Sequence, residues 1–228
     1  MNRSVVVVEL SGAVLTLVEV KGGPRQAALQ RYLVRRLPEN GVTADFISQL
    51  WREEKVLSSR IICTFSNRLI KFKTLTLPVL SDNQLQNAIR LELESSGSND
   101  CIYHIFSKTI REGMVTVKVA LVRNKDLTAV VRPFQDAGLT VLWLGYYCRG
   151  IQNFINFHRG FFHDDYEAAG YLIFFENGAE FGVVTDETIL YRRDLEINIS
   201  DFQEPRPAAE ADLIDELRLS TAAFQAGV

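Results

Sequence analysis

The chain begins with two runs of β-branched residues separated by a turn of small residues. The segment from Val5 to Val20 reads VVVVELSGAVLTLVEV, with Ser11-Gly12-Ala13 between the two runs. β-branched residues favour strands and small residues favour tight turns, so the pattern predicts a hairpin of residues 5–10 and 14–20. Both strands are apolar on both faces, which is typical of central strands. Some folds use such a strand, small-residue turn and strand to hold a phosphate.

The following residues extend this hairpin into a larger sheet. Residues 29–36 predict a third strand, with Tyr32 and Val34 on the face opposite to Arg31 and Arg35. Residues 43–55 have apolar side chains at helical spacing, and residues 60–65 predict a strand that returns to the sheet. The first part of the chain is therefore expected to be a β-β-β-α-β unit.

Residues 70–146 predict a different arrangement. The strand 70–77 ends at Pro78, and Ser81 with Gln84 predicts a capping box at the start of a helix over 82–95. A hairpin of 103–111 and 114–123, a helix over 125–137 and a strand over 139–144 follow. The order β-α-β-β-α-β is that of a ferredoxin-like subdomain.

The last part of the chain repeats the opening layout. A helix over 149–162 precedes three predicted strands, 171–176, 180–185 and 188–195, and a helix over 208–224 ends the chain. Two three-stranded meanders with an insertion between them describe an actin-like chain, although two unrelated domains would give the same pattern. We predict a first half over 1–69, an inserted subdomain over 70–146 and a second half over 147–228.

Composition excludes several classes of protein. The 228 residues carry a net charge of -3, so no global positive field favours nucleic acid. The three cysteines, Cys63, Cys101 and Cys148, are far apart in apolar surroundings and predict free thiols in a reducing compartment. The apolar runs are too short for a membrane helix, so we expect a cytoplasmic protein with no direct membrane insertion.

Signatures of catalysis and of metal binding are missing. None of His104, His158 and His163 stands in a nucleophile-like context, and neither Gly-x-Ser-x-Gly nor His-Glu-x-x-His is present. His163-Asp164-Asp165 fits a solvated loop better than a metal corner. We therefore expect no catalytic residues and no metal site.

Several segments resemble the PilM-like actin-like proteins of type IV pilus assembly, which are related to the cytoplasmic part of the type II secretion L protein. The resemblance lies in order and spacing, and its most specific part is TLTLP followed by a helix with AIRLELE. It implies an α/β actin-like (ribonuclease H-like) ATPase fold with the ferredoxin-like βαββαβ insertion, lacking the C-terminal part of the second half. The segments are Val6 to Ala13, Leu17 to Val20, Lys73 to Pro78, Leu85 to Glu94 and Ala137 to Leu139.

The resemblance also locates two phosphate loops, and both are degenerate in this chain. Relatives that bind ATP carry Asp-x-Gly at the end of the first strand and a lysine shortly after it, and a second Asp-x-Gly in the second half. A phenylalanine cannot ligate a metal, and a carboxylate repels phosphate at close range. We therefore expect a pseudo-ATPase with no cofactor, the alternative being an active ATPase that binds ATP with magnesium. The corresponding residues here are Glu9, Ser11, Gly12, Thr16, Phe174 and Glu176.

The function implied by the resemblance is that of a scaffold. Such a protein docks the cytoplasmic tail of an inner-membrane, PilN-like partner and is peripheral to the inner membrane through that partner. An extended peptide is expected in a groove beside the strand 70–77 and the helix 81–95, and Ile89→Asp is expected to weaken its binding without unfolding the protein. The sequence does not decide between pilus and secretion. The expected groove residues are Lys73, Leu75, Leu77, Leu85, Ile89 and Arg90.

Overall fold

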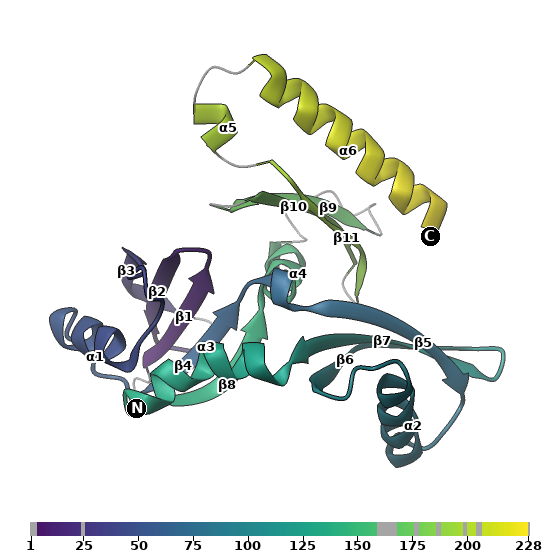
Figure 1. The fold of residues 1–228 in the computed structure, drawn as a ribbon, viewed down its shortest axis with the longest axis horizontal. Helices are drawn as coiled ribbons and strands as arrows, with labels where there is room; N and C mark the ends of the chain where they lie inside the picture. Colours follow the sequence, from purple (N-terminus) through teal and green to yellow (C-terminus); the bar gives the residue numbers. More distant parts are fainter. Residues whose placement is uncertain are drawn as a thin grey trace. The chain divides into compact units, whose positions relative to one another are not determined.

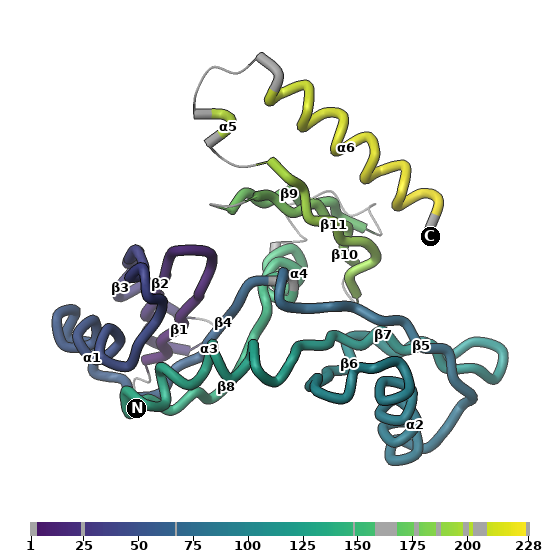
Figure 2. The backbone as a smooth tube through the Cα atoms, viewed as in Figure 1, coloured from purple at the N-terminus to yellow at the C-terminus, as the bar shows by residue number. Residues whose placement is uncertain are grey.

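The computed structural model describes residues 4–23, 26–158, 168–175, 178–185, 188–197, 200–203 and 207–227. It divides into two compact units (Figures 1 and 2). Unit 1 contains residues 1–66 and 131–228, and unit 2 contains residues 67–130. Unit 2 is therefore an insertion in the chain of unit 1.

Unit 1 contains a five-stranded mixed sheet, sheet A. Its order is β3-β2-β1-β4-β8, with β1 antiparallel to β2 and parallel to β4, and β4 parallel to β8. The predicted β-β-β-α-β unit is thereby confirmed. The elements are β1 (Ser4–Ser11), β2 (Val14–Lys21), β3 (Ala28–Arg36), α1 (Ala44–Glu53), β4 (Arg60–Phe65) and β8 (Thr140–Tyr146).

One face of sheet A forms a hydrophobic core with α1. Thr43 caps the start of α1 by accepting a hydrogen bond from the backbone N–H of Phe46. Ile47, Leu50 and Trp51 of α1 are buried, as are the side chains of one face of β1, β2 and β4. Alternation along the strands fixes this face, whose members are Val6, Val8, Leu15, Leu17, Ile61, Cys63 and Phe65.

A second, three-stranded sheet in unit 1, sheet C, has the order β11-β10-β9. Both neighbouring pairs are antiparallel, so the layout of β1, β2 and β3 is repeated, as the sequence predicted. Helix α6 contacts β11 through an ion pair of Arg193 with Glu216 at 2.8 Å and through the rings of Tyr191 and Phe224. The elements are α4 (Tyr147–His158), β9 (Ala169–Phe175), β10 (Gly178–Val184), β11 (Ile189–Leu195), α5 (Ser200–Gln203) and α6 (Pro207–Gly227).

Unit 2 is a three-stranded antiparallel sheet, sheet B, with one helix. The sheet order is β5-β7-β6, and α2 packs on it through Leu85, Ile89 and Leu93. The predicted capping box of Ser81 with Gln84 is present at the start of α2. The elements are η1 (Asn67–Leu69), β5 (Lys71–Pro78), α2 (Asp82–Ser95), β6 (Cys101–Arg111) and β7 (Met114–Arg123).

The structure corrects the predicted boundaries of the insertion. Strand β8 pairs with β4 in sheet A and not with the strands of unit 2, so residues 140–146 belong to the first half. Unit 2 is therefore β-α-β-β and ends near Val130, within α3 (Asn124–Asp136), instead of being βαββαβ over 70–146. The physical reason is that a parallel strand after a crossover helix completes the order β1-β4-β8 as readily as it completes a ferredoxin-like sheet.

Candidate functional site

The first predicted phosphate loop is a tight hairpin turn. Ser11 pairs with Val14, so Gly12 and Ala13 are the two turn residues, and Gly12 has a positive φ of 57°. Glycine adopts this conformation without strain, which explains why a small residue is needed here. A ligand such as a phosphate could therefore come close to the backbone of the turn. The side chains around the turn determine which ligand could bind there.

Glu9 is the charged side chain on the strand that leads into this turn. It pairs with Thr16 of β2 on one side and with Thr64 of β4 on the other. Burial raises the pKa of the Glu9 carboxyl above its ordinary value. Thr16 stands where ATP-binding relatives are expected to carry a lysine. Its neighbour on β1 is therefore a partly buried carboxyl group, that of Glu9.

A second carboxylate lies near the start of α4. Burial, followed by the negative charges of Glu9 and Glu180, raises the pKa of Tyr147. Glu180, on β10, is only 1% exposed. It accepts hydrogen bonds from the Tyr171 hydroxyl and from Nε of Arg192, each at 2.7 Å.

Gly182 makes room for this buried network. A Cβ at Gly182 would lie 2.3 Å from Cζ of Tyr171, so the Tyr171 ring occupies the space of the missing side chain. Arg192 also donates to Asp194 at 2.7 Å. The Arg192 guanidinium thus donates hydrogen bonds to two carboxylates of sheet C, those of Glu180 and Asp194.

The second predicted phosphate loop is the connection between β9 and β10. Phe174 packs edge-on against Phe202 of α5, with ring centroids 5.4 Å apart. Phe175 packs in the same manner against Tyr147 of α4 at 5.3 Å. The predicted loop residue Glu176 lies outside the described residues. The aromatic side chains here make apolar contacts and offer no ligand to a metal.

Sequence reasoning did not single out Glu180, Tyr171, Arg192 or Tyr147. The sequence shows which of these residues are charged or aromatic. It does not show that they lie close together, because this depends on the register of sheet C and on the contact of α4 with that sheet. The sequence contains no direct signal for either.

Three of the predicted groove residues require correction. Leu75, Leu85 and Ile89 lie in the hydrophobic core of unit 2, between sheet B and α2, and are not accessible to a peptide. Neither the helical spacing of Leu85 and Ile89 nor the strand alternation at Leu75 tells a buried face from a groove-lining face, which is why they were grouped with exposed residues. Of the remaining predicted residues, Lys73 is partly exposed and Arg90 is exposed near Glu94 at 3.9 Å, while Leu77 is partly exposed and packs against the same core.

Strand β5, which carries Lys73 and Leu77, is an edge strand of sheet B. It pairs with β7 on one side only. An edge strand presents unpaired backbone N–H and C=O groups along its free side. This edge can therefore accept an extended peptide as an additional strand, with specificity from the side chains of β5.

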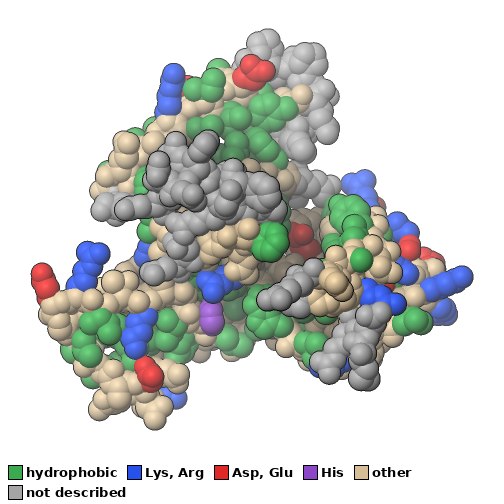
Figure 3. All heavy atoms as spheres, turned by 180° about the vertical axis from the view of Figure 1, so that it is seen from behind, with side chains coloured by type: hydrophobic (Ala, Val, Ile, Leu, Met, Phe, Trp, Pro, Cys, Tyr) green, Lys and Arg blue, Asp and Glu red, His purple; other side chains and the backbone are tan. Residues whose placement is uncertain are grey.

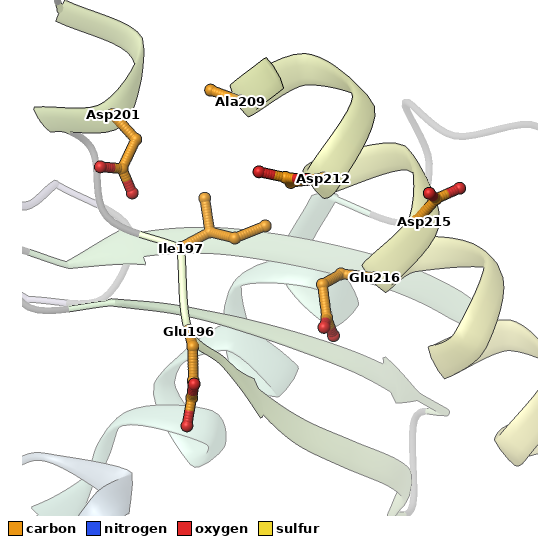
Figure 4. Close-up of a pocket in the computed structure, with 7 residues that line it drawn as sticks. All are labelled: Glu196, Ile197, Asp201, Ala209, Asp212, Asp215 and Glu216. Atoms are coloured by element: carbon orange, nitrogen blue, oxygen red, sulfur yellow. The ribbon is translucent and has the colours of Figure 1, made fainter. Parts of the chain in front are cut away.

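An acidic hollow of about 380 Å³ lies where β11 leads into α5 and α6. In Figure 4, the carboxylates of Asp201 and Asp212 point into the space above Ile197. Glu216 is paired with Arg193, and Asp215 with Arg218. Among the described residues, no group of three or more His, Cys, Asp or Glu side chains is arranged to hold a metal ion.

The repeated meanders, the order of sheet A and the insertion after β4 together define an actin-like fold, as predicted from the sequence. Within this class the chain resembles PilM. It aligns over 98% of its length with 71% of a chain of the PilM-PilN type IV pilus biogenesis complex, with a TM-score of 0.69 and 18% identity.

A second solved structure has the same fold. It is the cytoplasmic domain of EpsL, an inner membrane component of the type II secretion system of Vibrio cholerae. The alignment covers 84% of this chain and 71% of that one, with a TM-score of 0.55 and 14% identity. No protein-family model and no curated protein matches the chain. No helix of the described residues has the length and apolar character needed to cross a membrane.

Proposed function

We propose that this protein is a cytoplasmic scaffold of a type IV pilus or type II secretion assembly platform at the inner membrane. The observation that carries the proposal is the alignment of nearly the whole chain with a protein from a complex of PilM and PilN. By this reasoning the protein docks the cytoplasmic tail of a PilN-like membrane protein and is peripheral to the membrane through it.

The electrostatics of the candidate phosphate site support a scaffold over an ATPase. Phe174, at the second predicted phosphate loop, packs against Phe202 and offers no ligand to a metal. Thr16, beside Glu9, supplies a hydroxyl and no positive charge. Because ATP binds with magnesium and needs positive charge around its phosphates, the lack of a cation and of a metal ligand at these positions disfavours nucleotide binding. The second candidate, an active ATPase, rests on the fold alone.

The free edge of β5 is the proposed docking site for the tail. Main-chain hydrogen bonds along the edge would supply affinity, and the partly exposed Lys73 and Leu77 would select side chains of the tail. The proposed site keeps the strand predicted from the sequence. It differs from the predicted groove because the peptide binds to the edge of the strand and does not contact the buried residues Leu75, Leu85 and Ile89.

Calorimetric titration with the cytoplasmic tails of membrane proteins encoded beside this gene tests the proposal. One tail is expected to bind the nucleotide-free protein, and Leu77→Asp is expected to weaken binding by about 2 kcal/mol or more, the scale of a hot spot. Because Leu77 also packs against the core of unit 2, this loss supports the site only if circular dichroism shows the variant to be folded. Lys125→Glu, an exposed substitution at the start of α3, serves as the control for a change on the surface of unit 2. Absence of binding by every tail would refute the scaffold function, and binding unaffected by Leu77→Asp would refute the site.

A further inference from the structure

A hollow of about 860 Å³ lies in unit 1, at the end of sheet A where β1 begins. Its volume is within the range of sites that enclose a small ligand or a short piece of chain. The residues come from β1 to β4, from the loop between α1 and β4, and from β8. They include Val5, Glu19, Lys21, Arg31, Lys55, Leu57, Arg60, Ile62 and Leu142.

The charges that line the hollow are predominantly positive. Lys21, Arg31, Lys55 and Arg60 face a single acidic residue, Glu19. Glu19 accepts a hydrogen bond from the Ser4 hydroxyl at 2.6 Å and lies 3.6 Å from Nε of Arg31. Arg31 therefore balances Glu19, and three further cations remain around the hollow.

One donor in the hollow is left without an acceptor. Nη1 of Arg31 is buried and has no hydrogen-bond partner within the described part of the chain. A buried guanidinium N–H that lacks an acceptor costs free energy, and a carboxylate is the acceptor whose geometry fits it best. The site is thus prepared for an anionic group.

Large apolar side chains are exposed at the same place. Leu57 is 94% exposed, Leu142 50% and Val5 40%. The loop that presents Leu57 is held by hydrogen bonds: the Trp51 indole donates to the Ser58 carbonyl at 2.9 Å, and the Val56 N–H donates to the Trp51 carbonyl at 3.0 Å. Leu57 is therefore kept at the surface by a fixed loop, where it lines the same hollow as the exposed Val5 and Leu142.

An apolar row continues from the hollow across the outer face of sheet A. The strand register places Tyr32, Val18, Val7, Ile62 and Trp143 side by side, one from each strand. The outermost two, Tyr32 and Trp143, are more than half exposed. Figure 3 shows that hydrophobic side chains reach the surface among Lys and Arg side chains on the side of the molecule opposite to the view of Figure 1.

We propose that this hollow binds a segment of a partner protein that combines apolar side chains with Asp or Glu. The apolar residues of the segment would cover Leu57, Leu142 and Val5, while its carboxylates would meet Lys55 and Arg60. A free anion would leave the apolar side chains exposed. A nucleic acid would meet the cations but would leave Leu57, Leu142 and Val5 uncovered. The site lies in unit 1 and is separate from the proposed tail site on β5 of unit 2.

The test uses two short fluorescein-labelled peptides and the full chain. In one peptide leucine alternates with glutamate, and in the other leucine alternates with lysine. Fluorescence anisotropy is expected to show binding of the glutamate peptide and much weaker binding of the lysine peptide. The double substitution Lys55→Glu with Arg60→Glu is expected to weaken binding of the glutamate peptide at least about tenfold, because it places like charges opposite one another.

Two single variants separate the apolar and the electrostatic contributions. Leu57→Ser, at a side chain that is almost fully exposed, is expected to reduce affinity without changing the melting temperature. Arg218→Glu, an exposed charge reversal on α6 with half the charge change of the double substitution, is expected to leave affinity unchanged. The proposal is overturned if the two peptides bind equally, or if the double variant binds the glutamate peptide as the unsubstituted protein does. It is also overturned if only anionic vesicles or single-stranded DNA bind.

Discussion

The buried carboxylate of Glu180 gives the most stringent prediction about stability. Arg192→Met removes the guanidinium that donates to Glu180 and leaves the carboxylate in a site that is 1% exposed. Breaking one side of a buried ion pair costs about 3–5 kcal/mol, since the remaining charge has no compensation. Tyr171→Phe removes the other donor and is expected to cost about 1.5–3 kcal/mol, the range for a hydrogen bond to a charged group.

The neighbouring residue on β11 provides a matched control. Arg193 points to the opposite face of sheet C and pairs with Glu216, and both side chains are partly exposed. Solvent screens such a pair, so Arg193→Met is expected to cost about 1 kcal/mol or less. The two substitutions thus make the same chemical change one residue apart, in a buried and in a solvated pair.

Hydrogen exchange of the amides of β9, β10 and β11 measures the effect in the strands that carry the network. Arg192→Met is expected to lower protection in these strands far more than Arg193→Met. Adding Glu180→Gln to Arg192→Met is expected to restore part of the loss, because it removes the uncompensated charge. The reasoning is refuted if the two arginine substitutions cost the same, or if Glu180→Gln adds its full cost to that of Arg192→Met.

Three further predictions concern single side chains. Ile89→Asp, at a fully buried position, is expected to unfold unit 2, whereas Arg90→Asp leaves its circular dichroism and melting temperature unchanged; a folded Ile89→Asp variant would contradict the core assignment. Glu9→Gln is expected to stabilise the protein at neutral pH, because it removes a partly desolvated charge. Burial raises the pKa of Glu9 in the folded protein. The gain in stability should therefore vanish below pH 4.5, the ordinary pKa, where Glu9 is protonated in both the folded and the unfolded protein. A gain that persists in acid would show that the buried charge of Glu9 is not its cause. Burial raises the pKa of Cys63 to about 12, so its thiol should resist a disulfide reagent at pH 8 until the protein is denatured, as mass mapping of the labelled peptides would show.

Local signals in the sequence predicted most of the elements. The capping box at Ser81, the turn at Gly12 and the helical spacing around Leu50 each depend on residues a few positions apart, and each agrees with the structure. The repeat of two meanders was visible for the same reason, since hairpins connect neighbours in sequence. The actin-like fold followed from that repeat and from the resemblance in motif order.

Pairings between distant segments were harder to predict. Strand β8 could have joined sheet B or sheet A, because its apolar residues suit either, and only the pairing of Ile62 with Trp143 reveals the choice. The helical pattern of α2 likewise did not show which face meets sheet B, so Ile89 was placed in a groove. The network around Glu180 escaped prediction because it depends on strand register, which side-chain type alone does not specify.

The central claim is that the protein docks a membrane partner without using a nucleotide. The direct test titrates the partner's cytoplasmic tail into the protein by calorimetry, once without nucleotide and once with saturating ATP and magnesium. The account predicts the same affinity in both titrations and no heat from ATP alone, because Thr16 supplies no positive charge and Phe174 no metal ligand at the predicted phosphate loops. Tail binding that requires ATP, or saturable binding of ATP itself, would contradict it.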